Sequence, residues 1–209
     1  MAAVMEVSAT QAAASPAERR QAVIVCARLR GFTRLSDMLE ADRVLELSGE
    51  FFALARRTVD ANDGETVATQ NDTLTATFRH GKPSELVRRA ITAAQDLQYG
   101  FAPLADAWQR GFGLQAAVAL GLHLGNVVYG STGPDGHQRF TAIGEAVNIA
   151  GRLMHRARAG EFILSDSVMG ALQLSNLELD VEALPSLDCP RGPAIRIYGV
   201  LLDTRLDFT

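Results

Sequence analysis

The feature that most constrains this fold is an apolar run, AVIV at residues 22–25, which leads almost directly into a glycine turn. Residues 22–29 carry β-branched side chains and little charge, which is typical of a buried strand. The sequence GFT at 31–33 follows and turns the chain toward a helix. We therefore expect a buried strand, with a helix starting just beyond its end.

The remaining patterns alternate between helix and strand. Apolar spacing predicts helices over 41–60, 84–108 and 145–157. Threonine-rich segments on either side of Gln70–Asp72 predict a β-hairpin, 66–69 with 73–78, that has Asn71 and Asp72 near its tip. Further strand material is expected at 114–129 (interrupted by Gly121 and Gly125), 140–143, 161–164 and 194–201.

This order of elements is that of an α+β fold. We expect a ferredoxin-like α/β sandwich, in which helices flank a central, mostly antiparallel sheet and lie on one side of it. The domain is predicted to span residues 21–202. Residues 1–20, which are rich in small side chains, and residues 203–209 are predicted to be flexible tails.

Composition narrows the class of protein. The net charge is −4, which does not suit a general nucleic-acid binder. No apolar run approaches the roughly 20 residues that span a bilayer, so no membrane segment is expected. The two cysteines, Cys26 and Cys189, form neither a disulfide framework nor a zinc site, and Cys26 is expected to be a small buried apolar residue. These features favour a cytoplasmic protein.

Three stretches resemble the catalytic domain of class III nucleotidyl cyclases, the family of adenylate and guanylate cyclases. They are CARLRGFTRLS at 26–36, GETVATQNDTLTATF at 64–78, and GLHLGNVVYGSTGPDGHQRFTAIGEAVNIAGRL at 121–153. The third is long and specific, whereas the first two are altered. The resemblance covers most of residues 20–200 and is that of a degenerate member.

The resemblance implies a site shared between two paired domains. One face supplies two aspartates that hold two divalent ions, and the other supplies a base-reading pair and an Asn/Arg pair that grips ribose and triphosphate. The implied reaction is attack of the ribose 3′-hydroxyl on the α-phosphate with release of pyrophosphate. Two metal ions suit that displacement because they stabilise both the attacking and the leaving oxygen.

The metal-binding half of this implied site is altered. The first metal aspartate falls at Arg28, and the second falls at Asp72, which would be the single remaining ligand. Mg²⁺ prefers carboxylate oxygens, and an arginine adds positive charge where two cations would lie. We therefore predict no two-metal site and no cofactor, with Mg²⁺ or Mn²⁺ bound only if a partner completes the site. Arg28 is expected to pair with Asp72; the alternative is that it extends from the strand edge into solvent.

The nucleotide-binding half of the implied site is closer to the family pattern than the metal-binding half. The ribose-orienting asparagine falls at Asn148, the transition-state arginine at Arg152, and the second base-reading residue at Thr141. Asn148 and Arg152 are four residues apart and so share one helix face, although such arginines often only solvate a helix exterior. The base-reading lysine falls at Ala68, so discrimination between bases should be weak.

Two further sequence features give weaker evidence about function. The glycine-rich stretch 125–136 does not match a P-loop and is expected to be a mobile arm that reaches a partner. His123 and His137 lack metal-ligand spacing, and His123 is expected to be a hydrogen-bonding strand residue.

Three functions remain open from the sequence. The first is a degenerate cyclase homology domain, inactive alone, that dimerises and binds a nucleoside triphosphate as a regulatory module. The second is one subunit of a heterodimeric cyclase, to which it supplies Thr141, Asn148 and Arg152. The third is an active homodimeric cyclase with an unusual metal arrangement.

Overall fold

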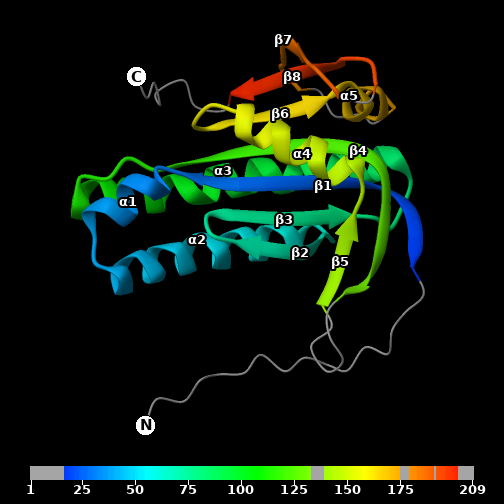
Figure 1. Ribbon diagram of the computed structural model, residues 1–209. Coiled ribbons are helices and arrows are strands. Elements are labelled where there is room, and N and C mark those ends of the chain that lie inside the picture. The colour runs from blue at the N-terminus through cyan, green and yellow to red at the C-terminus, as the bar shows by residue number, and fades with distance from the viewer. Residues whose placement is uncertain (1–16, 133–138, 175–178, 191, 202–209) are drawn as a thin grey trace.

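The computed structural model describes residues 17–132, 139–174, 179–190 and 192–201. Within them the chain forms one sheet with helices packed against it (Figure 1). The helices are α1 (Phe32–Met38), α2 (Ala41–Ala61), α3 (Pro83–Phe112), α4 (Glu145–Arg156) and α5 (Asp166–Leu172). The strands are β1 (Glu18–Arg30), β2 (Glu65–Gln70), β3 (Thr73–Phe78), β4 (Ala117–Thr132), β5 (Arg139–Ile143), β6 (Glu161–Ser165), β7 (Glu182–Leu187) and β8 (Ile195–Leu201).

The sheet follows the order β2-β3-β1-β4-β6-β8-β7, and β5 pairs with β4 off this path. β4 and β6 run parallel, and the other pairs among the described strands are antiparallel. The predicted α+β fold with a mostly antiparallel sheet is thus confirmed. The long strand β1 lies between β3 and β4, so the end of β1 is held next to the β2–β3 hairpin.

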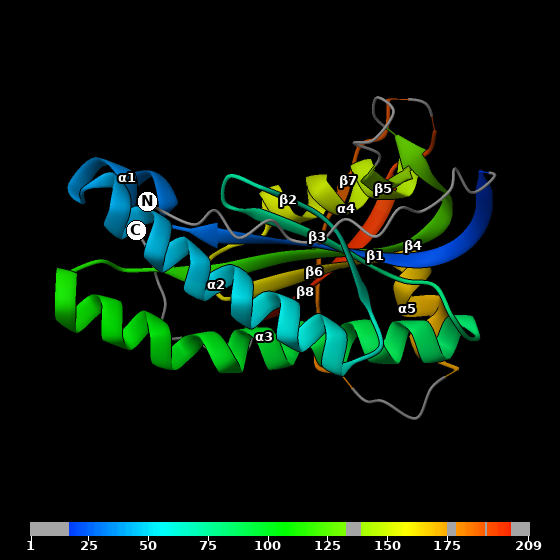
Figure 2. The same cartoon turned by 90° about the horizontal axis from the view of Figure 1, so that it is seen from below.

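Helices cover both faces of the sheet, so the expectation that they lie on one side was wrong. Figure 2 shows α2 and α3 along one face and α4 on the other. The reason is visible in β1, where Val23 and Val25 belong to the core under α2 and α3. Their neighbours Ile24 and Cys26 belong to the core under α4. Alternate residues of a strand point to opposite faces, and a continuous apolar run therefore needs cover on both.

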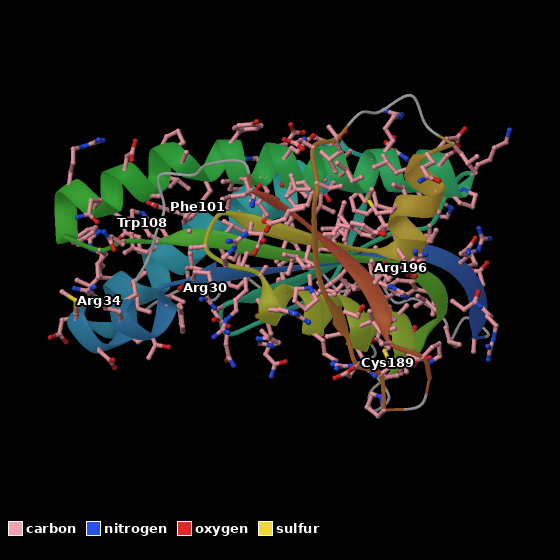
Figure 3. All side chains as sticks on the ribbon, turned by 90° about the horizontal axis from the view of Figure 1, so that it is seen from above. Arg30, Arg34, Phe101, Trp108, Cys189 and Arg196 are labelled. Carbon is pink, nitrogen blue, oxygen red and sulfur yellow. The ribbon has the colours of Figure 1, made fainter. Side chains whose placement is uncertain are left out.

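Aromatic side chains fill the layer between α2 and α3. The rings of Phe51 and Phe101 meet edge to face at 6.0 Å, and those of Phe101 and Trp108 at 5.4 Å. Trp108 also donates a hydrogen bond from Nε1 to Glu50, at 2.9 Å. Figure 3 labels Phe101 and Trp108 in this layer. Within the described residues, no helix is long and apolar enough to cross a membrane.

Several boundaries differ from the expected ones. β1 begins at Glu18, so the last three residues of the predicted N-terminal tail belong to the sheet. β4 runs unbroken through Gly121 and Gly125 to Thr132, so the first part of the glycine-rich stretch is strand. The rest of that stretch, His137, and most of both predicted tails lie outside the described residues.

Two short elements in the region expected to be irregular were not predicted. α5 has seven residues, too few for a helical periodicity to stand out. β7 is an edge strand with polar residues and Pro185, and its pairing with β8 shifts register between Leu184 and Leu187. Proline is tolerated at such an edge, but a proline within a segment argues against a strand when only the sequence is known.

Candidate functional site

The β2–β3 hairpin forms as predicted and sets the position of Asp72. Asn71 adopts φ 52°, the left-handed conformation that asparagine tolerates in a tight turn. The backbone carbonyl of Asp72 accepts a hydrogen bond from the N–H of Leu29, at 2.9 Å. This bond, with the pairing of Arg28 opposite Thr73 in the β1–β3 ladder, brings the hairpin tip to the end of β1.

Arg28 and Asp72 form an ion pair, which confirms the contact predicted between them. Nε of Arg28 lies 2.6 Å from Oδ2 of Asp72. The side chain of Asp72 is 13% exposed and that of Arg28 31% exposed, so the pair is partly shielded from water. A second nitrogen of Arg28 lies 3.3 Å from Nδ1 of His155 on α4. The alternative, that Arg28 extends freely into solvent, was wrong.

This donor set does not fit a pair of divalent cations. Hard cations need several oxygen ligands, and both oxygens of the Asp72 carboxylate already have partners, Oδ2 in Arg28 and Oδ1 in the hydroxyl of Thr73 at 3.3 Å. Within the described residues, no group of three His, Cys, Asp or Glu side chains lies close enough to hold a metal ion. Repulsion between Arg28 and an incoming cation adds to this mismatch.

A close approach between α4 and β4 positions the second predicted half of the site. A Cβ added at Gly121 of β4 would lie 2.3 Å from the carbonyl oxygen of Ala150 and 2.3 Å from the backbone nitrogen of Met154. Only glycine therefore lets the helix lie this near the sheet. The opposite face of α4 presents Asn148, which is exposed, and Arg152, which is half-buried.

Arg152 and Arg156 bind backbone carbonyls of the same chain. Arg152 donates from its guanidinium to the carbonyl of Asp188, and Arg156 donates to the carbonyl of Ser186, at 3.1 Å. Both contacts join α4 to the end of β7. No pattern in the sequence indicated them, because their acceptors are backbone groups in a segment that was expected to be irregular.

One groove brings the two predicted halves of the site together. It has a volume of about 540 Å³ and lies between the β2–β3 hairpin and α4. Its lining includes Arg28, Ala68, Asp72, Asn148 and Arg152. The groove therefore offers the guanidinium of Arg152 and the amide of Asn148 on one wall, and the ion pair between Arg28 and Asp72 on the other.

Thr141 does not line this groove. It lies on β5, where it pairs with Gly130 of β4, and its side chain is half-exposed.

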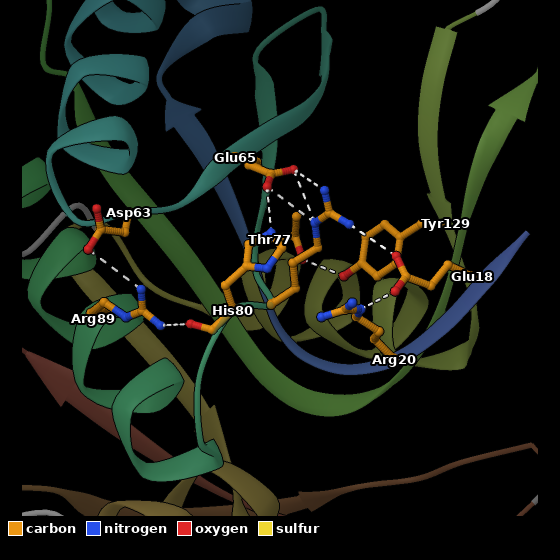
Figure 4. A network of polar contacts seen from close by, with 9 residues as sticks. Glu18, Arg20, Asp63, Glu65, Thr77, His80, Arg89 and Tyr129 are labelled. Atoms are coloured by element: carbon orange, nitrogen blue, oxygen red, sulfur yellow. Dashed lines mark hydrogen bonds and ion pairs between the residues drawn. The ribbon is translucent and has the colours of Figure 1, made fainter. Parts of the chain in front are cut away.

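A polar network fixes β5 and the start of β1 to the rest of the sheet (Figure 4). Arg79, at the end of β3, pairs with Glu65 at 3.0 Å and with Glu18 at 3.5 Å. Its guanidinium also lies over the rings of Tyr129 and Phe140, with the carbon 5.0 and 5.1 Å from their centroids. No pattern in the sequence indicated this cluster, because its members come from separate strands.

Tyr129 contributes a buried hydrogen bond to the same network. Its hydroxyl lies 2.6 Å from Oγ1 of Thr77. Burial raises the pKa of the Tyr129 phenol above its ordinary value, while the bond to Thr77 opposes the shift. Tyr129 is therefore a neutral, structural group.

Two other buried groups, Cys26 and His123, are also neutral. Burial raises the pKa of the Cys26 thiol to about 11, so it is not a reactive thiolate. Burial lowers the pKa of His123 to about 4, although Asp166 opposes the shift. Nδ1 of His123 lies 2.9 Å from Oγ of Ser165, which confirms its expected place as a hydrogen-bonding strand residue.

Comparison with known families gives one match over most of the chain. Residues 15–190 match the family described as the adenylate and guanylate cyclase catalytic domain. Among curated relatives, Adenylate cyclase 1 of Rhizobium meliloti is 27% identical over 140 residues, which are 65% of this chain and 20% of that protein. Adenylate cyclase of Anabaena cylindrica is 26% identical over 136 residues, 65% of this chain and 27% of that protein. The chain thus spans about a fifth to a quarter of the length of these relatives.

Solved cyclase structures share the fold at low sequence identity. The adenylyl cyclase CyaB from P. aeruginosa superposes with a TM-score of 0.83 at 20% identity, covering 93% of this chain and 100% of that one. The guanylyl cyclase Cya2 gives 0.79 at 19% identity, with 91% and 96% covered. A dimeric guanylyl cyclase domain of the RhoGC fusion protein from Blastocladiella emersonii gives 0.73 at 18% identity, with 88% and 98% covered.

Proposed function

Because the chain belongs to the adenylate and guanylate cyclase catalytic domain family, we propose that it is a degenerate member that is inactive alone. In this proposal it serves as a dimerising, nucleotide-binding regulatory module. The observation that carries the proposal is the ion pair between Arg28 and Asp72. The pair takes up the one carboxylate left at the place where the family resemblance implies two.

The electrostatics of the groove support binding without turnover. Asn148 and Arg152 line it and offer polar contacts to a sugar and to phosphate oxygens. Arg152 would need to leave its carbonyl partner, Asp188, in order to grip a ligand fully. Ala68 lines the same groove and has no polar side chain, so we expect ATP and GTP to bind with similar affinity.

Exposed apolar side chains support a cyclase-type partner. Phe140 is 42% exposed and Ile143 is 60% exposed, and both lie on β5. Exposed apolar residues mark a partner surface where they form a contiguous patch, and β5 carries two of them within four residues. We propose that the partner is a second copy of this domain or another cyclase-type domain, and that pairing occurs in the cytoplasm, where the free thiols of Cys26 and Cys189 stay reduced.

A turnover assay in Mn²⁺ tests the proposal. Wild type, incubated with ATP or GTP, should release no pyrophosphate and form no cyclic nucleotide. The double variant Arg28→Asp with Ala68→Lys should gain turnover if the scaffold is otherwise intact. Adding Asn148→Ala to the double variant should abolish that gain, which shows that the activity comes from this groove. Turnover by wild type alone would overturn the proposal in favour of an active homodimer.

A heterodimeric cyclase subunit is the second candidate. The observation that favours it is that Asn148 is exposed and, with Arg152, lines an open groove. Activity that appears only when this chain is mixed with a cyclase domain carrying both aspartates, and that disappears with Arg152→Ala, would select this candidate. Mixtures without turnover would favour the regulatory module over the heterodimeric enzyme.

A further inference from the structure

The last residues of β7 and those that follow it, 185–190, form a segment against α4 that we call the strap. Figure 3 labels Cys189 in this segment. Leu187 is 7% exposed and belongs to the same apolar cluster as Ile149 and Leu153 of α4. The other strap residues are exposed or half-buried. Leu187 is therefore the apolar anchor that seats the strap on the helix.

Two arginines of α4 hold the strap on either side of this anchor. Arg156 donates to the carbonyl of Ser186, at 3.1 Å. Arg152 donates from its guanidinium to the carbonyl of Asp188. The two arginines are four residues apart, so they lie on one face of the helix and reach the same segment. Hydrogen bonds from a charged donor are stronger than those between neutral groups, so these contacts add to the apolar anchor.

The two arginines differ in their relation to the groove. Arg152 is half-buried and lines the groove, so its guanidinium lies between the groove and the strap. Arg156 is exposed and is not among the residues that line the groove. The bond from Arg156 therefore holds the strap without contributing to the groove. The bond from Arg152 uses donors that a ligand in the groove would also need.

We propose that the strap is an autoinhibitory element that competes with the phosphates of a ligand for the guanidinium of Arg152. The inference rests on the proposed function, since the ligand is the nucleoside triphosphate that we propose for the groove. A phosphate oxygen binds a guanidinium more strongly than a neutral carbonyl does, so the ligand can displace the strap. The observed affinity is lower than that of the open form, in proportion to the fraction of chains in which the strap is open.

Arg156 separates this inference from simple electrostatics. If charge alone governs binding, removing a cation one helical turn from Arg152 should weaken the binding of a triphosphate. If the strap competes for Arg152, Arg156→Ala removes one of the two polar attachments of the strap and makes the open form more frequent. Binding should then become tighter. The two explanations predict changes of opposite sign.

Calorimetric titration of the full chain with ATP in EDTA measures this sign. Arg156→Ala should bind ATP about threefold to tenfold more tightly than wild type. Arg156→Lys keeps the charge and a donor for the carbonyl of Ser186, so it should bind like wild type. Arg56→Ala is the matched control, because Arg56 is an exposed arginine of α2 outside the groove and the strap, and it should leave the affinity unchanged. Thermal unfolding checks that each variant is folded.

Hydrogen exchange, followed by mass spectrometry, reads the strap itself. Without ligand, the amides of residues 182–189 should exchange severalfold faster in Arg156→Ala than in wild type. Saturating ATP should speed the exchange of the same amides in wild type, because Arg152 leaves the carbonyl of Asp188. Arg56→Ala should show the wild-type exchange at these positions.

Three results would each overturn the inference: weaker or unchanged ATP binding by Arg156→Ala, unchanged exchange of residues 182–189 in that variant, and ATP binding that slows this exchange or leaves it unchanged. In each of these cases ATP binding by wild type would still support the proposed function. ATP binding by neither wild type nor Arg156→Ala would refute nucleotide binding in the groove, and the inference with it.

Discussion

Nε of Arg28 lies 2.6 Å from Oδ2 of Asp72, and this contact joins the end of β1 to the tip of the β2–β3 hairpin. The backbone bond from Leu29 to the carbonyl of Asp72 holds the two segments in register. Backbone pairing within the sheet therefore places the two side chains next to each other. In the proposed function, the pair places a positive group where the family resemblance implies a metal ligand.

A double-mutant cycle should detect the Arg28–Asp72 pair. Arg28→Ala, Asp72→Ala and the double variant, compared by urea unfolding, should give a coupling free energy of about 1 kcal/mol, because the pair is partly shielded. Arg43 and Glu46 form a matched control pair on α2, with side chains 46% and 57% exposed. Their coupling should be about 0.3 kcal/mol. Equal coupling free energies in the two cycles would contradict the prediction that the partly shielded Arg28–Asp72 pair is stronger than an exposed pair.

Gly121 should be intolerant of a side chain. Gly121→Ala places a Cβ against the backbone of α4 at Ala150 and Met154, so the helix must move away from the sheet. We expect a loss of about 2 to 3 kcal/mol in the free energy of unfolding, measured in urea.

Gly151 provides the control for this variant. It lies on α4 itself, and a Cβ there meets nothing within 4 Å. Gly151→Ala should leave stability unchanged or raise it by up to about 1 kcal/mol, because alanine favours the helix. A tolerated Gly121→Ala would show that α4 does not depend on this close approach.

The sequence predicted the hairpin from a local rule, and it predicted the ion pair because the family resemblance places Arg28 and Asp72 at the two metal positions. The turn needs a residue that tolerates a positive φ, and Asn71 is such a residue. The register of the β1–β3 ladder, which places Arg28 opposite Thr73, was not predicted, and it makes Arg28 and Asp72 neighbours. Asn148 and Arg152 likewise share one wall of the groove because they are four residues apart on a helix.

Other features depend on tertiary contacts that a single sequence does not reveal. The apolar run of β1 indicated burial but not which helix covers its second face. The carbonyls that bind Arg152 and Arg156 belong to the end of β7, an edge strand masked by Pro185. The Arg79 cluster joins the ends of separate strands, and its partners are far apart along the chain.

Stability should fall in mild acid because of His123. Its pKa is about 4 in the folded protein, below the ordinary value of 6.5, since burial disfavours the charged ring. The unfolded chain therefore binds a proton first as the pH drops. Stability is complete above pH 6.5 and is lost as the pH falls toward 4, by up to about 3 kcal/mol.

Urea unfolding at several pH values measures this slope. His123→Asn should flatten it, because the variant has no ring to protonate. His80→Asn is the control, since the His80 side chain is 57% exposed, and it should leave the slope in place. An unchanged slope in His123→Asn would assign the acid sensitivity to other groups.

The two thiols should differ in reactivity. Cys26 is buried with a pKa of about 11, whereas Cys189 is only half-buried. Iodoacetamide at pH 8, followed by mass spectrometry of peptides, should label Cys189 in the folded protein and label Cys26 only after unfolding. Rapid labelling of Cys26 in the folded state would mean that the reagent reaches this buried thiol without unfolding of the protein.

The most direct test of the central claim is a crystal of the wild-type protein soaked with Mn²⁺ and ATP, with anomalous scattering used to locate the metal. We expect no anomalous peak at Asp72 and an intact contact between Arg28 and Asp72. The Arg28→Asp variant, soaked in the same way, should show Mn²⁺ between residue 28 and Asp72. A Mn²⁺ ion bound to Asp72 in the wild type, with Arg28 displaced, would contradict the claim that the metal chemistry of this cyclase fold has been replaced by an ion pair.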